Sequence, residues 1–269
     1  MGAWGIGIFS NDTACDVRDM YLDFLAYGYD DMKAEGTTIE YWIPQIGGTE
    51  EEPNFWFALA AAEHKYGRLS DKVHERALYY VEHNEDDLIL WSGAQKRKRH
   101  DVLKKLAATL ALPAKRKRVP PLRAHSTGWK PGDIVLARVA EKNDDAMFAM
   151  QVFDIVNVPC SSFIPDGPQN QVPVVGLYRW IGKGTPDAHE LVRCGFINQK
   201  NCTGDSNTEP YVFCLMTTER ECKKYRCAVT ENSSLYLSIV DEDTIKRRIG
   251  STWGGFKSCI AILQNRMGE

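Results

Sequence analysis

The spacing of hydrophobic residues changes from a helical period to a strand period near the middle of the chain. In the first half, the apolar residues of 17–25 recur at i, i+3, i+4 and i+7, which is one face of a helix. The same reasoning predicts helices over 53–67 and 70–83, joined by a glycine turn, and a longer helix over 93–112. Pro113 ends the last of these. The first half therefore predicts a small helical bundle.

From Trp129 onward, apolar and polar residues alternate, and clusters of Pro, Gly, Asn and Asp separate the runs. Such runs are typical of a twisted antiparallel sheet or a small barrel. The predicted strands are 134–139, 146–158, 172–181, 188–197, 211–218, 225–230 and 234–240. Residues 241–250 predict a short helix, and the chain from 251 onward predicts a second helix that packs on the sheet through Ile260, Ile262 and Leu263. The W-x-x-G-D-I entry to the first strand resembles that of SH3-like barrels.

These patterns predict an α+β protein. The predicted organisation is an all-helical bundle over 1–112, a basic Pro-containing linker over 113–128, and an antiparallel β-rich domain over 129–269. The β-rich domain is expected to be an SH3-like barrel with C-terminal helices. We expect the two folded parts to be separate domains, because 269 residues suffice for two medium-sized cores.

The opening segment GAWGIGIFSND allows two hypotheses, a phosphate-binding loop or a structural start to the bundle. Only half of a GxGxxG fingerprint is present, no strand precedes it, and Asp12 and Asp16 would repel a phosphate. The structural hypothesis is favoured: the glycines let the backbone run tightly across the bundle, and Asp12 caps the first helix. The side chains then expected in the core are Trp4, Ile6, Ile8 and Phe9.

This start also resembles a bacterial family of unknown function. The residues that carry the resemblance are Trp4, Gly5, Phe9, Asn11, Asp12, Ala14 and Asp16, and the segment 52–69 is similar to a second part of that family. The resemblance covers roughly the first 110 residues and implies a bacterial source and a helical N-terminal module. Some relatives are suspected toxin-immunity proteins, which implies a neutralising role. The resemblance brings no catalytic residues to this chain.

Charge is distributed unevenly along the chain. Residues 1–95 have a net charge of −12, residues 96–131 of +11, and residues 132–269 of −2. Two KRKR clusters dominate the middle segment: Lys96, Arg97, Lys98 and Arg99, then Lys115, Arg116, Lys117 and Arg118. Such clusters attract polyanions by releasing counterions. Neutralisation by the acidic bundle, or plain solvation, is the favoured alternative, and no motif for sequence-specific nucleic-acid recognition is present.

The search for catalytic chemistry yields no predicted catalytic residue, metal ligand or cofactor. The six histidines are scattered without metal-binding spacing, and the eight cysteines are expected to be buried free thiols, because no second close pair accompanies Cys222 and Cys227. Trp180 and Trp253, each next to flexible glycines, are predicted binding residues. We expect a cytoplasmic protein, because the chain has no export signal and no apolar run approaching the ~20 residues of a membrane span.

The sequence therefore favours a non-enzymatic bacterial binding protein whose partner is another protein, such as a toxin or other effector that it neutralises. The first alternative is nucleic-acid association through residues 96–123. A hydrolase using His and Asp at a barrel mouth is a third hypothesis. The sequence does not predict the oligomeric state.

Overall fold

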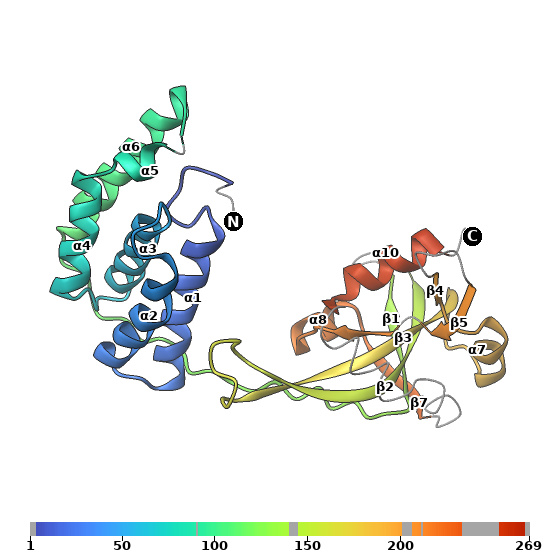
Figure 1. Ribbon diagram of the computed structural model, residues 1–269. Helices are drawn as coiled ribbons and strands as arrows, with labels where there is room; N and C mark the ends of the chain where they lie inside the picture. The colour runs from blue at the N-terminus through green and yellow to red at the C-terminus, as the bar shows by residue number, and fades with distance from the viewer. Residues whose placement is uncertain are drawn as a thin grey trace. The chain divides into compact units, whose positions relative to one another are not determined.

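The computed structural model describes residues 4–89, 91–139, 145–200, 206–210, 212–232 and 253–266. The chain divides into two compact units (Figure 1). The helical unit comprises residues 1–123 together with 161–167, and the sheet unit comprises 124–160 and 168–269. The basic segment up to Arg123 thus belongs to the helical unit, whereas the sequence predicts a separate linker over 113–128.

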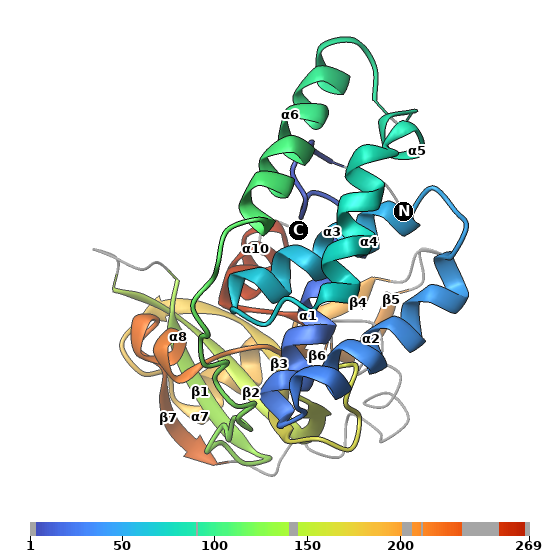
Figure 2. The ribbon, with the colours of Figure 1, turned by 90° about the vertical axis from the view of Figure 1, so that its left-hand side faces the viewer.

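The helical unit contains the helices that the hydrophobic spacing predicts and two more. The helices are α1 (Asp12–Tyr27), α2 (Asp31–Ile46), α3 (Glu52–Lys65), α4 (Asp71–Glu82), α5 (Glu85–Ile89) and α6 (Gly93–Leu110). The hydrophobic spacing does not predict α2 or α5. The Asp30 side chain caps α2 by accepting the N–H of Lys33 at 2.8 Å. Figure 2 shows α6 running beside α4, against which it packs.

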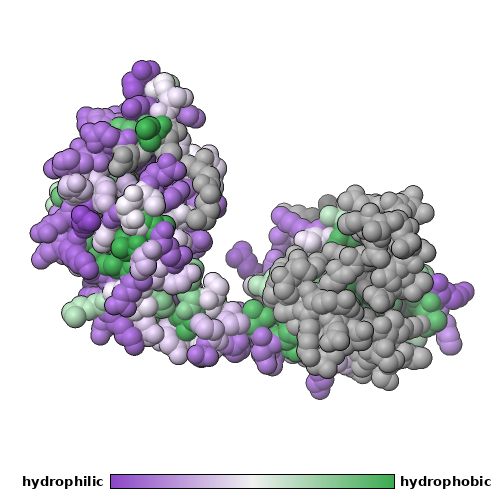
Figure 3. All heavy atoms as spheres, viewed as in Figure 1, coloured by the Kyte–Doolittle hydropathy of each residue, from purple (hydrophilic) through white to green (hydrophobic). Residues whose placement is uncertain are grey.

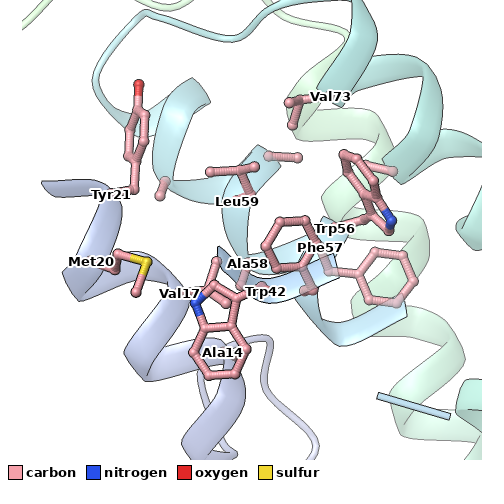
Figure 4. Packing of buried hydrophobic residues seen from close by; sticks show 14 of the residues in the cluster. Ala14, Val17, Met20, Tyr21, Trp42, Trp56, Phe57, Ala58, Leu59 and Val73 are labelled. Carbon is pink, nitrogen blue, oxygen red and sulfur yellow. The ribbon is translucent and has the colours of Figure 1, made fainter. Parts of the chain in front are cut away.

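The core of the helical unit is built around α3. From Pro53 to Ala60 every residue of this helix is buried, because α1 packs on one side of it and α4 on another. Figure 4 shows Val17 and Met20 of α1, Trp42 of α2 and Leu59 of α3 in this cluster. Phe163 and Ile164 complete the cluster from the segment 161–167. A helix buried on so many sides lacks a polar face, which explains its weak amphipathic pattern.

The opening segment differs from the prediction in two details. Asn11, rather than Asp12, caps α1, because its side-chain oxygen accepts the N–H of Ala14 at 2.7 Å. Trp4 is 63% exposed and lies outside the core, whereas Ile8 and Phe9 pack against the core as expected. The expectation that Trp4 fills the bundle is therefore wrong.

The sheet unit is built on an open antiparallel sheet. Its strands are β1 (Asp133–Arg138), β2 (Ala146–Pro159), β3 (Gln169–Lys183), β6 (Val212–Leu215), β7 (Ala228–Asn232) and β8 (Trp253–Gly254). They lie in the order β7-β1-β2-β3-β6-β8, and all neighbours are antiparallel except β6 and β8. A separate hairpin pairs β4 (Asn198–Lys200) with β5 (Ser206–Pro210). The α+β architecture is thus confirmed.

The alternation of β1 places an apolar cluster on each face of the sheet. Ile134 and Leu136 belong to one cluster, and Val135 and Ala137 to the other, as the period of two predicts. The second cluster also contains Leu263 of α10 (Phe256–Arg266), which confirms the predicted packing of the C-terminal helix on the sheet. The predicted elements over 234–240 and 241–250 lie outside the described residues.

One predicted strand is a helix. Residues 188–194 form α7 (Ala188–Cys194), whereas the sequence predicts a strand over 188–197. The Asp187 side chain accepts the N–H of Glu190 at 2.7 Å, and this N-cap starts the helix that buries Leu191 against the sheet. A further helix of the sheet unit, α8 (Glu219–Lys224), begins with a capping box between Thr218 and Glu221. In the described part of the chain, no helix is both long enough and apolar enough to cross a membrane.

Candidate functional site

The first KRKR cluster lies on α6, and its four residues have different environments. Lys96, Arg97 and Lys98 are exposed, whereas the Arg99 side chain is only 1% exposed. Nε and Nη2 of Arg99 donate to the two carboxylate oxygens of Asp87 at 2.9 and 2.6 Å. This bidentate ion pair is internal to the helical unit. Arg99 is therefore not offered to a partner, in contrast to its predicted role as a binding residue.

The Arg99 guanidinium also contacts the opening glycine loop, and this contact indicates the role of the loop. Nη1 of Arg99 donates to the backbone carbonyls of Ile6 and Gly7 at 3.0 and 3.2 Å, and Nη2 also donates to Asn54 Oδ1 at 2.9 Å. A phosphate-binding loop directs N–H groups at its ligand. Here the loop directs carbonyl oxygens at an internal cation, which supports its structural interpretation.

The second KRKR cluster runs along the helical unit without regular secondary structure. The Lys117 N–H donates to the Tyr66 carbonyl at 3.0 Å, which ties the segment to the end of α3. Arg116 Nη1 forms an ion pair with Asp31 at 2.8 Å, and this aspartate also pairs with Arg68. Lys115, Lys117 and Arg118 are exposed. Internal neutralisation therefore accounts for Arg99 and Arg116 but leaves most of the basic side chains on the surface.

The two tryptophans predicted to bind a partner lie in the sheet unit. Trp180 is 6% exposed; its ring packs over Gly182, and its Nε1 donates to Glu190 Oε1 at 2.8 Å. Trp180 is therefore a core residue with a satisfied polar atom rather than an exposed platform. The backbone of Trp253 forms β8, and its side chain lies outside the described part. Both tryptophans belong to the sheet unit, whereas both KRKR clusters belong to the helical unit.

A different surface of the helical unit has the composition of a binding site. Five residues of α4 and its C-cap share one stripe of the helix, and we call them the α4 stripe: Lys72, Arg76, Tyr79, Tyr80 and His83. Their spacing of i, i+4, i+7, i+8 and i+11 aligns them along the helix axis. All except Tyr80 are exposed, and Tyr79 retains 47% of its surface. Asp71, Glu75 and Glu82 line the neighbouring stripe, so opposite charges are segregated on α4.

Glu52, the first residue of α3, contacts two residues of this stripe, Arg76 and Tyr80. Its carboxylate accepts the backbone N–H of Gly48 at 2.7 Å and the indole N–H of Trp56 at 3.0 Å. The Tyr80 hydroxyl also donates to it, and Arg76 Nη2 lies 3.5 Å away. Burial alone would raise the pKa of Glu52, but these donors and the Arg76 charge together hold it below its ordinary value. The carboxylate therefore stays ionised and fixes both stripe residues.

Aromatic contacts orient the exposed part of the stripe. The Arg76 guanidinium lies 5.6 Å from the ring centroids of both Trp56 and Tyr80 and 5.7 Å from that of Tyr79. Tyr79 in turn stacks on His83, with ring centroids 4.5 Å apart. Figure 3 shows that the visible face of the helical unit is mostly hydrophilic with apolar patches between. Four residues of the α4 stripe thus form a connected cation–aromatic surface on the helix: Arg76, Tyr79, Tyr80 and His83.

This surface is not among the residues predicted to bind a partner, although the sequence contains a signal for it. The signal is the regular spacing of the basic and aromatic residues on one face of the helix that is predicted over 70–83. The sequence gives no sign of the contact with Glu52, which lies on a different helix.

A small cavity of about 200 Å³ lies in the sheet unit. The residues that line it include His125, Thr217 and Thr218.

Comparison with known proteins finds no family model that matches the chain, no match among curated proteins and none among solved structures.

Proposed function

We propose that this protein binds another protein through the α4 stripe of its helical unit. The observation that carries the proposal is the exposed Arg76–Tyr79–His83 surface, held from below by Glu52. Tyr, Trp and Arg are the residues that most often dominate the binding energy of protein interfaces. Side chains already ordered in the free protein lose less conformational entropy on binding.

The charge of the stripe defines the chemistry of the partner. The Arg76 guanidinium lies 5.7 Å from the Tyr79 ring centroid, His83 stacks on that ring, and Lys72 adds a second positive charge to the same stripe. We therefore infer a partner surface that presents carboxylates next to an apolar or aromatic group. The resemblance of the opening segment to a family with suspected toxin-immunity members favours a toxin or other effector, which the protein would neutralise by contact alone.

Photo-crosslinking in the source cell tests this proposal. Tyr79 is replaced by the photoreactive benzoylphenylalanine, and Tyr27, which is 42% exposed on α1, carries the same group in the matched control. We expect a crosslinked protein from position 79 that is not obtained from position 27. Adding Arg76→Ala to the position-79 variant should remove most of this product, because the guanidinium orients the ring.

Two results would contradict the proposal. One is the same crosslinked products from both positions, which indicates nonspecific collision. The other is a product from position 79 whose yield does not change with Arg76→Ala, with the fold verified by circular dichroism. In both cases the α4 stripe is ordinary helix surface.

The exposed part of the KRKR clusters supports a second candidate, nucleic-acid association. Lys96, Arg97 and Lys98 lie on one helix, and Lys115, Lys117 and Arg118 lie on the following segment of the same unit. Binding of this kind weakens steeply as salt rises. The test is titration of a labelled oligonucleotide at low and high salt with these six residues neutralised to Gln. Binding that persists in the neutralised variant excludes this candidate.

Two further predictions, the SH3-like barrel and the cytoplasmic localisation, remain proposals. The open sheet, with β7 and β8 at its ends, and the turn that enters β1 support completion to a small SH3-like barrel. The lack of a membrane-crossing helix among the described residues is compatible with a cytoplasmic protein. A solved structure of the full chain and fractionation of the source cell test these two proposals.

A further inference from the structure

Two cysteines of the sheet unit are brought together where α8 ends. The Cys227 N–H donates to the Cys222 carbonyl at 2.9 Å, and the Arg226 N–H donates to the Lys223 carbonyl at 3.3 Å. Arg226 itself adopts φ +49°, in the left-handed region. This combination is a Schellman motif, in which the side chain after the turn packs against a side chain in the last helical turn. In this protein both of those side chains are thiols.

The thiols contact each other and differ in proton affinity. Cys222 and Cys227 share a hydrogen bond, and the Thr217 hydroxyl lies 3.5 Å from Cys222 Sγ. The hydrogen bond from Cys227 is the main cause that lowers the pKa of Cys222 to about 6, against the effect of burial. The same hydrogen bond, followed by burial, raises the pKa of Cys227. Both are free thiols with part of their surface accessible.

We propose that Cys222 and Cys227 form a redox modification site that a peroxide converts to an intramolecular disulfide. The Cys222 thiolate attacks one oxygen of hydrogen peroxide, the O–O bond breaks, and hydroxide leaves to become water on protonation. Cys222 is now a sulfenic acid. The Cys227 sulfur then attacks the Cys222 sulfur as its proton leaves, the S–O bond breaks, and a second water departs. Two thiols are oxidised, and one peroxide is reduced to two waters.

Other cysteines of the sheet unit provide an internal comparison. Cys214 and Cys259 have no exposed surface, and burial raises their pKa values to about 11 and about 12. A thiol reacts as its thiolate, so these two should be inert at neutral pH. Cys194 is partly exposed, as Cys222 is, and packs beside the apolar cluster that contains Ile134 and Leu136. The redox site is therefore limited to the pair Cys222 and Cys227.

Peptide mapping of the purified full chain tests the site. The protein is treated with hydrogen peroxide, the remaining thiols are blocked with N-ethylmaleimide, and the digest is analysed by mass spectrometry. We expect a peptide in which Cys222 and Cys227 have lost two hydrogens and which dithiothreitol returns to the reduced form. In Cys227→Ser, Cys222 should react with dimedone, the trap for sulfenic acids. Cys194→Ser should leave the disulfide unchanged.

The untreated wild-type protein supplies a readout that does not depend on the folding of any variant. At pH 7, iodoacetamide should modify Cys222 at least about tenfold faster than Cys194, because the hydrogen bond from Cys227 favours the Cys222 thiolate, which is the reactive form. Equal rates at the two positions would overturn the proposal. So would peroxide treatment that oxidises other cysteines of the chain while the pair 222–227 stays reduced.

Discussion

At the residue scale, neighbouring basic side chains of the same cluster have opposite roles. Arg99 is buried in an ion pair with Asp87, whereas Lys98 is exposed. The sequence contains a signal for this difference. Arg99 precedes Leu103, Leu106 and Leu110 at i, i+4, i+7 and i+11, so it lies on the buried stripe of α6. A charge on such a stripe requires an internal counter-charge, but which acid supplies it depends on the packing of α5.

Removing Arg99 should therefore destabilise the protein strongly. Arg99→Met leaves the buried Asp87 carboxylate and the carbonyls of the opening loop without their donor, and the expected loss is about 3–5 kcal/mol. The matched variant Lys98→Met should change the free energy of unfolding by less than about 0.5 kcal/mol. Denaturant unfolding followed by circular dichroism measures both. Similar losses in the two variants would refute the internal role of Arg99.

The buried Glu63 makes the stability of the helical unit depend on pH. This side chain is 1% exposed, and desolvation by burial raises its pKa to about 8 from an ordinary value near 4.5. The folded state thus holds a proton that the unfolded state releases above pH 4.5. The Glu63 contribution is fully present below that pH and is lost as pH rises toward 8.

Comparison with Glu63→Gln isolates this effect from the other carboxylates. The stability advantage of the variant over the wild type should grow between about pH 4.5 and pH 8 and level off above, because the amide cannot ionise. The difference in free energy of unfolding between the two proteins should change in total by a few times about 1.4 kcal/mol, which is the free energy of a tenfold change in proton affinity. Urea unfolding at several pH values measures it. A difference independent of pH would show that Glu63 is ionised in the folded state.

At the element scale, periodicity predicted the elements with clear two-faced patterns and failed where the pattern was ambiguous. α1, α6 and the β1–β2–β3 strands follow their predicted spans closely. The pattern of α7 predicts a strand because seven residues are too few to distinguish the two periods, although Asp187 is a recognisable N-cap. The buried positions of α2 include Ala34 and Thr38, which a search for large apolar side chains passes over.

The turn between α3 and α4 should not tolerate a side chain at Gly67. Its φ is +66°, and a Cβ would lie 2.4–2.5 Å from the backbone of Lys115 and Arg116. Gly28 also has a positive φ, +109°, but a Cβ there meets nothing within 4 Å. Gly67→Ala should therefore lower the free energy of unfolding by about 1–3 kcal/mol more than Gly28→Ala.

Limited trypsin digestion gives an independent readout of this prediction. Gly67→Ala should expose the 115–118 segment and accelerate cleavage there, because the added methyl group displaces that backbone. Gly28→Ala should cleave at the wild-type rate. Equal effects of the two variants on stability and cleavage would mean that the segment does not lie against the turn.

At the scale of the whole molecule, the sequence predicts two folded parts, but the segments that compose them are not contiguous. Residues 161–167 come from the turn between β2 and β3, yet Ile164 is buried in the core of the helical unit. No local pattern reveals a contact with residues more than a hundred positions away. The α4 stripe has the same limitation: its spacing is visible in the sequence, but its order depends on Glu52 and Trp56 of α3.

The central claim is that the α4 stripe recognises another protein, and the affinity of the crosslinked partner for variants of α4 tests it most directly. Isothermal titration calorimetry compares wild type with Arg76→Ala and with Glu75→Ala, a neighbouring exposed residue outside the stripe. We predict that Arg76→Ala weakens binding at least about tenfold, as hot-spot truncation does, while Glu75→Ala changes it less than about threefold. Equal dissociation constants for all three proteins would contradict the account.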